Sequence, residues 1–526
     1  MTTVESCRIE LPLFARSREI PDKTAVIDGR LSWSYGALAT LVAATSARLQ
    51  AAGLRAGDRA VIFLDKHVEA VVALYAVWAA GGIAVPAYEG LRSRQVRHIV
   101  EDSGARLLIS TARKLASLES GSAGEAAPFV LDRRTLRGWR VPEGGAPRRL
   151  AGGTEPAAIL YTSGSTGAPK GILVSHANLC AGARIVARYL GLRRDERVLS
   201  VLPFGFDYGL NQLLTTVRTG ATLHLQRSHF PPDICRTLAD QRITLLAAVP
   251  PLWAQLMDRF SPFSRTAFPH LRTLTNSGGV FPAALVRRYR AQLPQARLFL
   301  MYGLSEAFRS TFLPPELVDS RTGSIGRAIP ETEVLVVARG ADGSVRLCAD
   351  DEPGELVHSG PTVALGYWRQ PEATAQRFRP HPFAPESGAV AVYSGDIVRR
   401  DRDGFLYFIG RSDQQIKSQG YRVSPEDVEQ ILHDSGMVSA ALVCGRPDET
   451  AGTVLVAHVV PNERFSEQAL LAFCHREMPT YMVPRAVRVH QSLPCTPSGK
   501  LDRNAVIDDA PPADQAGSLY RKPAAA

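Results

Sequence analysis

The sequence predicts an α/β protein with a large N-terminal domain of layered α/β subdomains and a small C-terminal α+β domain. Short apolar runs that are typical of strands alternate with helix-like segments through most of the chain. The chain has 526 residues, which is too long for one hydrophobic core. The pattern of charged and apolar residues changes near residues 410–415. This leaves a final segment of about one hundred residues, within the usual size of a small domain. We therefore expect domains at 1–411 and 412–508, followed by a disordered Ala/Pro-rich tail at 509–526.

The expected elements follow one another in a regular order. A strand, a helix and a further strand in succession are typical of mostly parallel sheets. The segments are a strand at 59–64, a helix from His67, a strand at 83–87, a polar helix at 93–104, and strands at 106–110, 242–250 and 297–303.

One uncharged run, from Ala70 to Tyr88, is long enough to cross a bilayer. Gly81, Gly82 and Pro86 interrupt it, so we expect a buried helix, a glycine turn and a short strand instead. The N-terminus lacks a charged start followed by an apolar core, which argues against a signal peptide. We expect no membrane span and a cytoplasmic location.

The cysteines and the charge also limit the class of protein. The seven cysteines are scattered and form no CxxC pair, which favours reduced thiols in a cytosolic protein. The net charge is +10 and is dispersed. It indicates either a solvated surface or attraction to polyanions such as nucleotides, CoA or an acidic carrier protein. We expect no nucleic-acid partner, because no basic block is interleaved with aromatic residues.

A glycine- and hydroxyl-rich loop, TSGSTGAPKG, lies between two apolar strand-like runs, AAILY and GILVS. Glycines let backbone N–H groups face an anion, hydroxyl groups add donors and a lysine adds charge. The loop is not a Walker A motif, because Gly171 follows Lys170 where that motif needs Ser or Thr. It predicts a polyphosphate cradle made of Thr162, Ser163, Gly164, Ser165, Thr166, Gly167 and Lys170.

This loop resembles the phosphate loop of the AMP-forming adenylating enzymes, which include acyl-CoA synthetases, adenylation domains of peptide synthetases and luciferases. Four further stretches match that family, and the resemblance covers the chain from Leu31 to Arg503. Within the family, the form FDYGLNQ, residues 206–212, most resembles acyl-CoA ligases associated with exosortase loci and free-standing ligases that load an amino acid onto a carrier protein.

Two of the four stretches concern the nucleotide. In MYGLSEA, Ser305 stands where the family has Thr, which keeps the hydroxyl group. The resemblance implies that Tyr302, next to Gly303, lies against adenine, that Ser305 bonds the α-phosphate and that Glu306 helps to hold Mg²⁺. In NSGGVF, the resemblance implies that the backbone lines adenine and the acyl pocket, here at Gly278 and Gly279.

The third stretch runs from Tyr393 to Glu429, and Asp403-Gly404 within it predicts a hairpin turn. By resemblance, Asp396 accepts both ribose hydroxyls and Arg411 contacts ribose and phosphate. The resemblance also places the interdomain hinge at Asp413, and the loop that covers the site in the second half-reaction at Gly420 and Arg422.

The fourth stretch is CTPSGKLDR, in which Lys500 matches the lysine that bridges carboxylate and α-phosphate oxygens. Adenylation brings two anions together, and Lys170, Lys500 and Mg²⁺ would offset their repulsion. The resemblance implies a mobile small domain that rotates about the hinge, withdraws Lys500 and opens a tunnel for pantetheine. Lys500 should therefore matter for the first step only.

The acid pocket is expected near VLPFGFDYGLNQ, where Phe206 replaces the His of many acyl-CoA ligases. Asp207 has two interpretations that stay open: it binds the ammonium group of an amino acid, or it is structural and caps backbone amides. The expected pocket residues are Phe206, Asp207, Tyr208, Trp253, Ser277 and Phe308.

These features predict an AMP-forming ligase that activates a carboxylic acid with Mg·ATP and transfers it to a thiol. The insertion of fatty acyl-AMP ligases is missing from GRSDQQIKSQGYRV, which favours complete thioester formation, and CoA is the first choice of acceptor. One alternative is a free-standing amino-acid adenylation enzyme that charges a phosphopantetheine carrier protein. Two others are a phosphotransferase, which would release ADP, and a non-catalytic nucleotide-binding relative.

Overall fold

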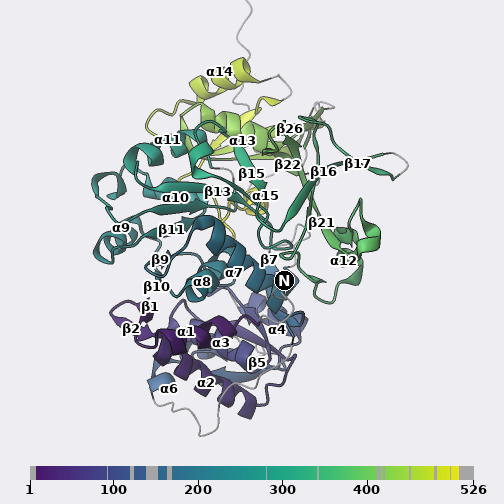
Figure 1. Ribbon diagram of the computed structural model, residues 1–526. Coiled ribbons are helices and arrows are strands. Elements are labelled where there is room, and N and C mark those ends of the chain that lie inside the picture. The colour runs from purple at the N-terminus through teal and green to yellow at the C-terminus, as the bar shows by residue number, and fades with distance from the viewer. Residues whose placement is uncertain are drawn as a thin grey trace, which may run out of the picture.

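The computed structural model shows an α/β protein with a large N-terminal part and a small C-terminal part (Figure 1). It describes residues 8–91, 93–118, 124–137, 152–162, 169–279, 281–340, 343–411, 416–418, 421–448, 452–478, 482–497 and 499–508. In Figure 1 the N-terminal elements lie at the bottom in purple and the C-terminal elements at the top in yellow and green.

Two sheets with parallel centres form the large part. The strands predicted at 59–64, 83–87, 106–110, 242–250 and 297–303 all lie in these centres, but antiparallel pairings are at least as frequent as parallel ones in the two sheets. In these parallel centres most strands are short, apolar and buried on both faces, as expected where helices cover a parallel sheet, while the edge strand at 127–130 is mostly exposed. The parallel centre of the first sheet has the order β1 (Thr24–Asp28), β10 (Thr222–Leu225), β9 (Arg197–Ser200), β11 (Leu245–Ala248), β12 (Thr273–Asn276) and β13 (Arg297–Tyr302). That of the second has the order β6 (Ala127–Val130), β5 (Leu107–Ser110), β3 (Arg59–Phe63), β4 (Ile83–Pro86) and β7 (Pro156–Thr162).

Antiparallel strands extend both sheets. β2 (Leu31–Ser34) pairs with β1, and β8 (Lys170–Ser175) and β19 (Gly366–Tyr367) continue the second sheet from β7. The first sheet continues from β13 through β14 (Thr311–Leu313), β15 (Ser324–Ala328), β22 (Leu406–Arg411), β21 (Val390–Arg400), β18 (Gly354–Ser359), β16 (Glu333–Arg339) and β17 (Val345–Leu347), with β20 (Phe378–Pro380) beside β21. The predicted hairpin turn joins β21 to β22, where Gly404 has φ +82°.

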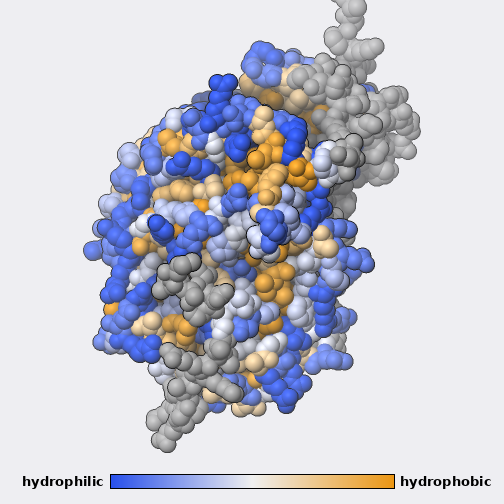
Figure 2. Space-filling model, turned by 45° about the vertical axis from the view of Figure 1, so that its right-hand side comes forward, coloured by the Kyte–Doolittle hydropathy of each residue, from blue (hydrophilic) through white to orange (hydrophobic). Residues whose placement is uncertain are grey.

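The uncharged run at Ala70 to Tyr88 folds as the sequence predicts. Every residue of α3 (Val68–Ala79) is buried, Gly81 turns the chain with φ +85°, and β4 follows. Within the described residues, no helix is both long and apolar enough to cross a membrane. On the face drawn in Figure 2, hydrophobic residues form separate patches in a largely hydrophilic surface.

Helices connect and cover these strands. α7 (His176–Leu190) begins at a capping box in which Ser175 and Asn178 satisfy each other's backbone N–H groups. α8 (Asp207–Thr219) packs beside it and ends at Gly220, which has φ +73°. The other helices of the large part are α1 (Leu11–Glu19), α2 (Tyr35–Ala51), α4 (Ser93–Ser103), α5 (Ala112–Ser117), α6 (Arg133–Arg137), α9 (Pro231–Asp240), α10 (Pro250–Leu256), α11 (Ala283–Gln292) and α12 (Pro371–Arg377).

The C-terminal part is an α+β unit with a hydrophobic core of its own, centred on Val428, Leu432, Val443 and Leu470. This separate core supports the predicted small domain, while the boundary at residues 411 and 412 stays a prediction. The elements are β23 (Ile416–Ser418), β24 (Tyr421–Val423), α13 (Pro425–Asp434), β25 (Val438–Asp448), β26 (Gly452–Pro461), α14 (Glu467–Glu477), β27 (Ala486–Val489) and α15 (Arg503–Asp508).

Candidate active site

A cleft of about 2170 Å³ lies between the large part and the small part. It forms at the carboxyl ends of β11, β12 and β13, where ligands bind in open α/β sheets. The described residues predicted to bind nucleotide all line it, although they come from distant parts of the chain. They are Thr162, Lys170, Gly278, Gly279, Tyr302, Gly303, Ser305, Glu306, Asp396, Arg411 and Lys500.

The phosphate loop is the connection of a β-hairpin. Thr162 ends β7 and pairs directly with Lys170, which begins β8, so both ends of the loop are fixed in the sheet. The strands are buried, as the sequence predicts. Ser163 to Gly167 lie outside the described residues, and their role in binding phosphate stays a prediction.

Asp396 and its neighbours form one wall of the cleft. Asp396 is 5% exposed as a residue, and its carboxylate accepts a hydrogen bond from Tyr302 Oη and lies 3.1 Å from Arg411 Nη1 through Oδ1. Asp396 and Arg411 face each other across the β21–β22 hairpin, so the sheet sets their separation. Burial, followed by the Asp396 charge, raises the pKa of Tyr302 well above its ordinary value. The phenol therefore stays protonated and donates to the carboxylate.

Replacing Asp396 with Asn is expected to raise the KM for ATP about 10- to 100-fold, with a smaller change in kcat. The carboxylate is the expected acceptor for ribose hydroxyls, and a hydrogen bond to a charged group contributes about 1.5–3 kcal/mol. Initial rates at varied ATP concentration measure the effect. Asp403→Asn, at the exposed turn of the same hairpin, is the matched control. An unchanged KM for ATP in Asp396→Asn would show that this carboxylate does not bind the ribose.

Lys500 reaches the cleft from the small part. A tight turn presents it, in which Thr496 N donates to the Lys500 carbonyl at 2.7 Å and Gly499 has φ +84°. Its Nζ lies 5.6 Å from the centre of the Phe206 ring. Gly278 has φ +85°, and a Cβ there would lie 3.0 Å from Lys500 Cε. Glycine at 278 therefore suits the positive φ of the turn after β12 and lets the lysine side chain pass close to the backbone.

Glu306 is held by a tyrosine that the sequence analysis missed. Tyr367 Oη donates to Glu306 Oε1 at 2.7 Å, and Lys170 Nζ lies 5.7 Å from the centre of the Tyr367 ring. Burial, followed by the Glu306 charge, raises the pKa of Tyr367 above its ordinary value, so the phenol remains a donor. Only the pairing of β19 with β8 brings Tyr367 to the site, and no local sequence signal marks it.

The residues around Glu306 fit a magnesium ion. A hard dication needs carboxylate and phosphate oxygens, and the Tyr367 hydroxyl anchors one oxygen of this carboxylate. Glu306 lies in the loop after β13 and lines the cleft. Glu306 is therefore the residue that would hold Mg²⁺ here, together with oxygens of the substrate.

Replacing Tyr367 with Phe is expected to raise the Mg²⁺ concentration needed for half-maximal rate about tenfold, because the Glu306 carboxylate loses its orienting donor. The Phe ring still supports Lys170, so the change in kcat should be smaller. Tyr407→Phe removes a similar phenol–carboxylate bond, to Asp401, outside the cleft and serves as the control. Equal Mg²⁺ dependence in the two variants would contradict this role.

Two models of known families match the chain, one for an AMP-binding enzyme over residues 13–368 and one for an AMP-binding enzyme C-terminal domain over residues 427–500. The chain belongs to the AMP-binding enzyme family. The match to the second model agrees with the small C-terminal unit and includes the position of Lys500.

Curated relatives of two kinds are similar to this AMP-binding enzyme. A feruloyl-CoA synthase of Amycolatopsis sp is 33% identical over 500 residues, which cover 93% of this chain and 96% of the relative. Bacitracin synthase 3 of Bacillus licheniformis is 29% identical over 501 residues. The chain spans only 8% of that synthase, and similarly small parts of the other large peptide synthetases.

Solved structures share the whole fold. The o-succinylbenzoate CoA synthetase of Bacillus subtilis, solved with its acyl-adenylate intermediate, has a TM-score of 0.81 and 26% identity and covers 96% of this chain and 99% of its own. An anthranilate CoA ligase in complex with anthranoyl-AMP has a TM-score of 0.85 at 23% identity, covers 96% of this chain and 97% of its own, and supports the fold alone.

The structure changes the view of Asp207, which lines the cleft together with Phe206. Both of its oxygens have partners within the protein. Oδ2 lies 3.1 Å from Arg309 Nη1, and Oδ1 accepts from Tyr208 N at 2.8 Å at the start of α8. This arrangement favours the structural interpretation over binding of a substrate ammonium group. The sequence analysis missed Arg309, because an isolated arginine after MYGLSEAF carries no local signal.

Four of the expected pocket residues do not line the cleft. Trp253 and Phe308 are fully buried, and Trp253 packs edge-on against Tyr289. Ser277 is buried, and Tyr208 is buried with its hydroxyl donated to the Thr275 carbonyl. Large aromatic residues mostly pack in cores, and here the aromatic residues of this set pack in the core beneath the cleft. None of these four side chains lines the cleft itself, and Tyr208 lines a smaller pocket beside it.

Three remaining residues of the expected site cannot be placed with their side chains. Asp413, the expected hinge, and Gly420 of the expected thiol-tunnel loop lie outside the described residues. Arg422 lies in β24, where its backbone pairs with Lys417.

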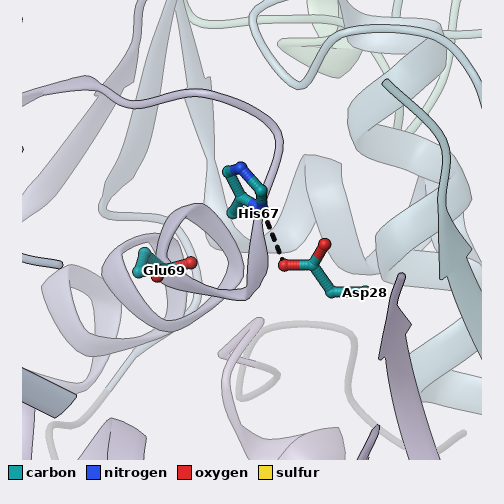
Figure 3. Close-up of side chains that lie close together, drawn as sticks. All are labelled: Asp28, His67 and Glu69. Atoms are coloured by element: carbon teal, nitrogen blue, oxygen red, sulfur yellow. Dashed lines mark hydrogen bonds and ion pairs between the residues drawn. The ribbon is translucent and has the colours of Figure 1, made fainter. Parts of the chain in front are cut away.

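A second cluster of ionisable residues lies away from the cleft (Figure 3). Asp28 Oδ2 lies 2.8 Å from His67 Nδ1, and Glu69 follows in the first turn of α3. Arg133 Nη2 contacts both Asp28 Oδ2, at 2.5 Å, and His67 Nδ1, at 2.8 Å, and its Nε lies 3.4 Å from Glu69. The guanidinium already supplies the positive charge at this place. We interpret the cluster as an internal ion-pair network.

Proposed function

We propose that this AMP-binding enzyme activates a carboxylic acid with Mg·ATP to an acyl-adenylate and transfers the acyl group to a thiol, with CoA as acceptor. The observation that carries the proposal is the convergence of Lys170, Lys500 and Glu306 on one cleft from two parts of the molecule. The family and the described geometry both support this reading.

The first step joins two anions. A carboxylate oxygen attacks the α-phosphorus of ATP, and pyrophosphate leaves. Lys170 and Lys500 offset the repulsion between the carboxylate and the phosphates, and fixed charges of this kind act strongly where water is excluded. Asp396 and Arg411 hold the ribose, and Ser305 donates to the α-phosphate. Mg²⁺, when bound at Glu306, would neutralise charge on the leaving pyrophosphate.

In the second step the thiol sulfur attacks the acyl carbon, and AMP leaves with the oxygen that joined it to the acyl group. Lys500 fills the space above Gly278, so the small part must move before a thiol can enter there. Of the contacts between the two parts, the ion pair of Arg259 with Glu463 is 2.8 Å long and exposed at both ends. Exposed pairs stabilise by little, so this pair would not oppose the motion.

CoA is favoured over a carrier protein by the feruloyl-CoA synthase relative, which this chain matches over 96% of its length. The peptide synthetases keep the alternative open, in which the enzyme charges a phosphopantetheine carrier protein with an amino acid. The partnered state of Asp207 speaks against an amino acid. We place the reaction in the cytoplasm, which the free thiols of the described cysteines support.

Acid-dependent exchange of labelled pyrophosphate into ATP, across a panel of fatty, aryl and amino acids, tests the proposal. We expect exchange with at least one acid, and a mass spectrum that shows its CoA thioester after CoA is added. Release of ADP instead of AMP would indicate a phosphotransferase. Acid-independent binding of ATP with no exchange would indicate a non-catalytic relative.

A further inference from the structure

A second, much smaller pocket of about 20 Å³ shares the lining residue Met301 with the cleft. It is lined by apolar residues and by a group of polar side chains from α8, β12 and the loop after β13. The polar members are Tyr208, Asn211, Gln212, Thr215, Thr275 and Arg309. A polar cavity of this size holds one water molecule or one group of similar size.

Arg309 has hydrogen-bond capacity that the described protein does not use. Its side chain is 2% exposed, and Nη1 donates to the Phe308 carbonyl and to Asp207. Nε and Nη2 are buried without a partner. Two acceptors among the cavity side chains, Asn211 Oδ1 and Gln212 Oε1, are also buried without a partner. Each such atom costs about 1–3 kcal/mol unless a water molecule or ligand satisfies it.

The cavity adjoins the place where the acid must bind. The Met301 side chain lines both the cavity and the cleft, and Asp207 lines the cleft while it pairs with Arg309. Methionine is flexible enough to let a substrate pass along it. A buried ion pair is rarely needed for stability, because well-packed apolar residues often serve as well. An arginine with unused hydrogen-bond donors at this position therefore points to recognition of a group on the acid substrate.

We infer that the distal end of the acid enters this cavity, and that it carries an uncharged group that both accepts and donates a hydrogen bond, a hydroxyl group being the one that fits. This inference rests on the proposed function and names its substrate class. Arginine only donates, so the group that meets Nε or Nη2 must accept. The hydroxyl hydrogen can then be donated to the amide oxygen of Asn211 or Gln212. Asp207 already balances the Arg309 charge, so a second carboxylate would be an unbalanced buried charge.

The test uses straight-chain and phenyl-ended acids of increasing length, each with a hydrogen, a hydroxyl group or a carboxylate at its far end. Pyrophosphate exchange gives kcat/KM for each acid. At the best length we expect the hydroxyl-ended acid to exceed the plain acid about 100-fold or more, because a site built to bond a hydroxyl group rejects the analogue without it. The dicarboxylic acid should be the poorest of the three. Non-hydrolysable acyl-sulfamate analogues of AMP should show the same order in binding titrations.

Arg309→Lys keeps a positive charge beside Asp207 but removes the two unused donors, and we expect it to lower the preference to about tenfold or less. Gln212→Met keeps the length of the side chain but removes one hydrogen-bond acceptor from the cavity. It should lower the preference for hydroxyl-ended acids in part. Melting temperature and ATP binding check that both variants fold. Plain acids that match hydroxyl-ended acids in the parent enzyme would overturn the inference, as would an unchanged preference in folded Arg309→Lys. Exchange with no acid at all would overturn the proposed function, and the inference with it.

Discussion

Replacing Lys500 with Gln is expected to lower acid-dependent pyrophosphate exchange on the order of 100-fold or more. The lysine supplies a fixed cation at the cleft, and its side chain passes close to Gly278. Glutamine has similar length and no charge, so the change tests the charge itself. Exchange rates at saturating ATP and acid measure the loss.

The same variant should form thioester from a synthetic acyl-adenylate and CoA at close to the parent rate. In the second step the small part withdraws Lys500, so the charge has no role there. Lys23→Gln is a suitable control, because Lys23 bonds backbone carbonyls on the far side of the large part. Equal losses in both half-reactions would show that Lys500 maintains the fold of the site. An unchanged rate of pyrophosphate exchange would show that Lys500 has no role in adenylation.

Replacing Glu306 with Gln is expected to lower kcat/KM for MgATP on the order of 100-fold. The amide keeps the shape and the bond to Tyr367, but it loses the negative charge that a hard dication prefers. The loss should shrink as the Mg²⁺ concentration rises, because part of it comes from weaker metal binding. Initial rates over a matrix of ATP and Mg²⁺ concentrations separate the two effects.

Glu316→Gln offers a control for this variant, since Glu316 lies in a short helix of the large part and does not line the cleft. A Glu306→Gln enzyme with parent rates at low Mg²⁺ would contradict metal binding at this carboxylate. The Tyr367→Phe variant should change the Mg²⁺ dependence in the same direction as Glu306→Gln but by less, because it keeps the negative charge of Glu306.

The nucleotide side of the site could be predicted from the sequence because its residues lie in short contiguous motifs. Lys170 begins a strand, Glu306 and Lys500 lie in turns and Asp396 lies within β21, and the fold brings these local motifs together at the cleft. The parallel strands were predictable for a similar reason, since apolar runs such as β11 are buried on both faces and flanked by helices.

The acid side could not be predicted in the same way, because pairing between distant segments decides it. Arg309 lies far along the chain from Asp207, and nothing near either residue indicates that they form an ion pair. Trp253 and Phe308 are large apolar residues close to the site in sequence, yet the core beneath the cleft takes both. Tyr367 reaches Glu306 only because β19 is added to the edge of the second sheet.

The central claim is that the acid attacks the α-phosphorus of ATP in this cleft. The most direct test is to supply an active acid with ¹⁸O in its carboxylate, together with MgATP and CoA, and to weigh the products. The account predicts one ¹⁸O atom in each AMP, carried over when the thiol displaces it from the acyl group. Label in inorganic phosphate with ADP as the other product, or AMP without label, would contradict it.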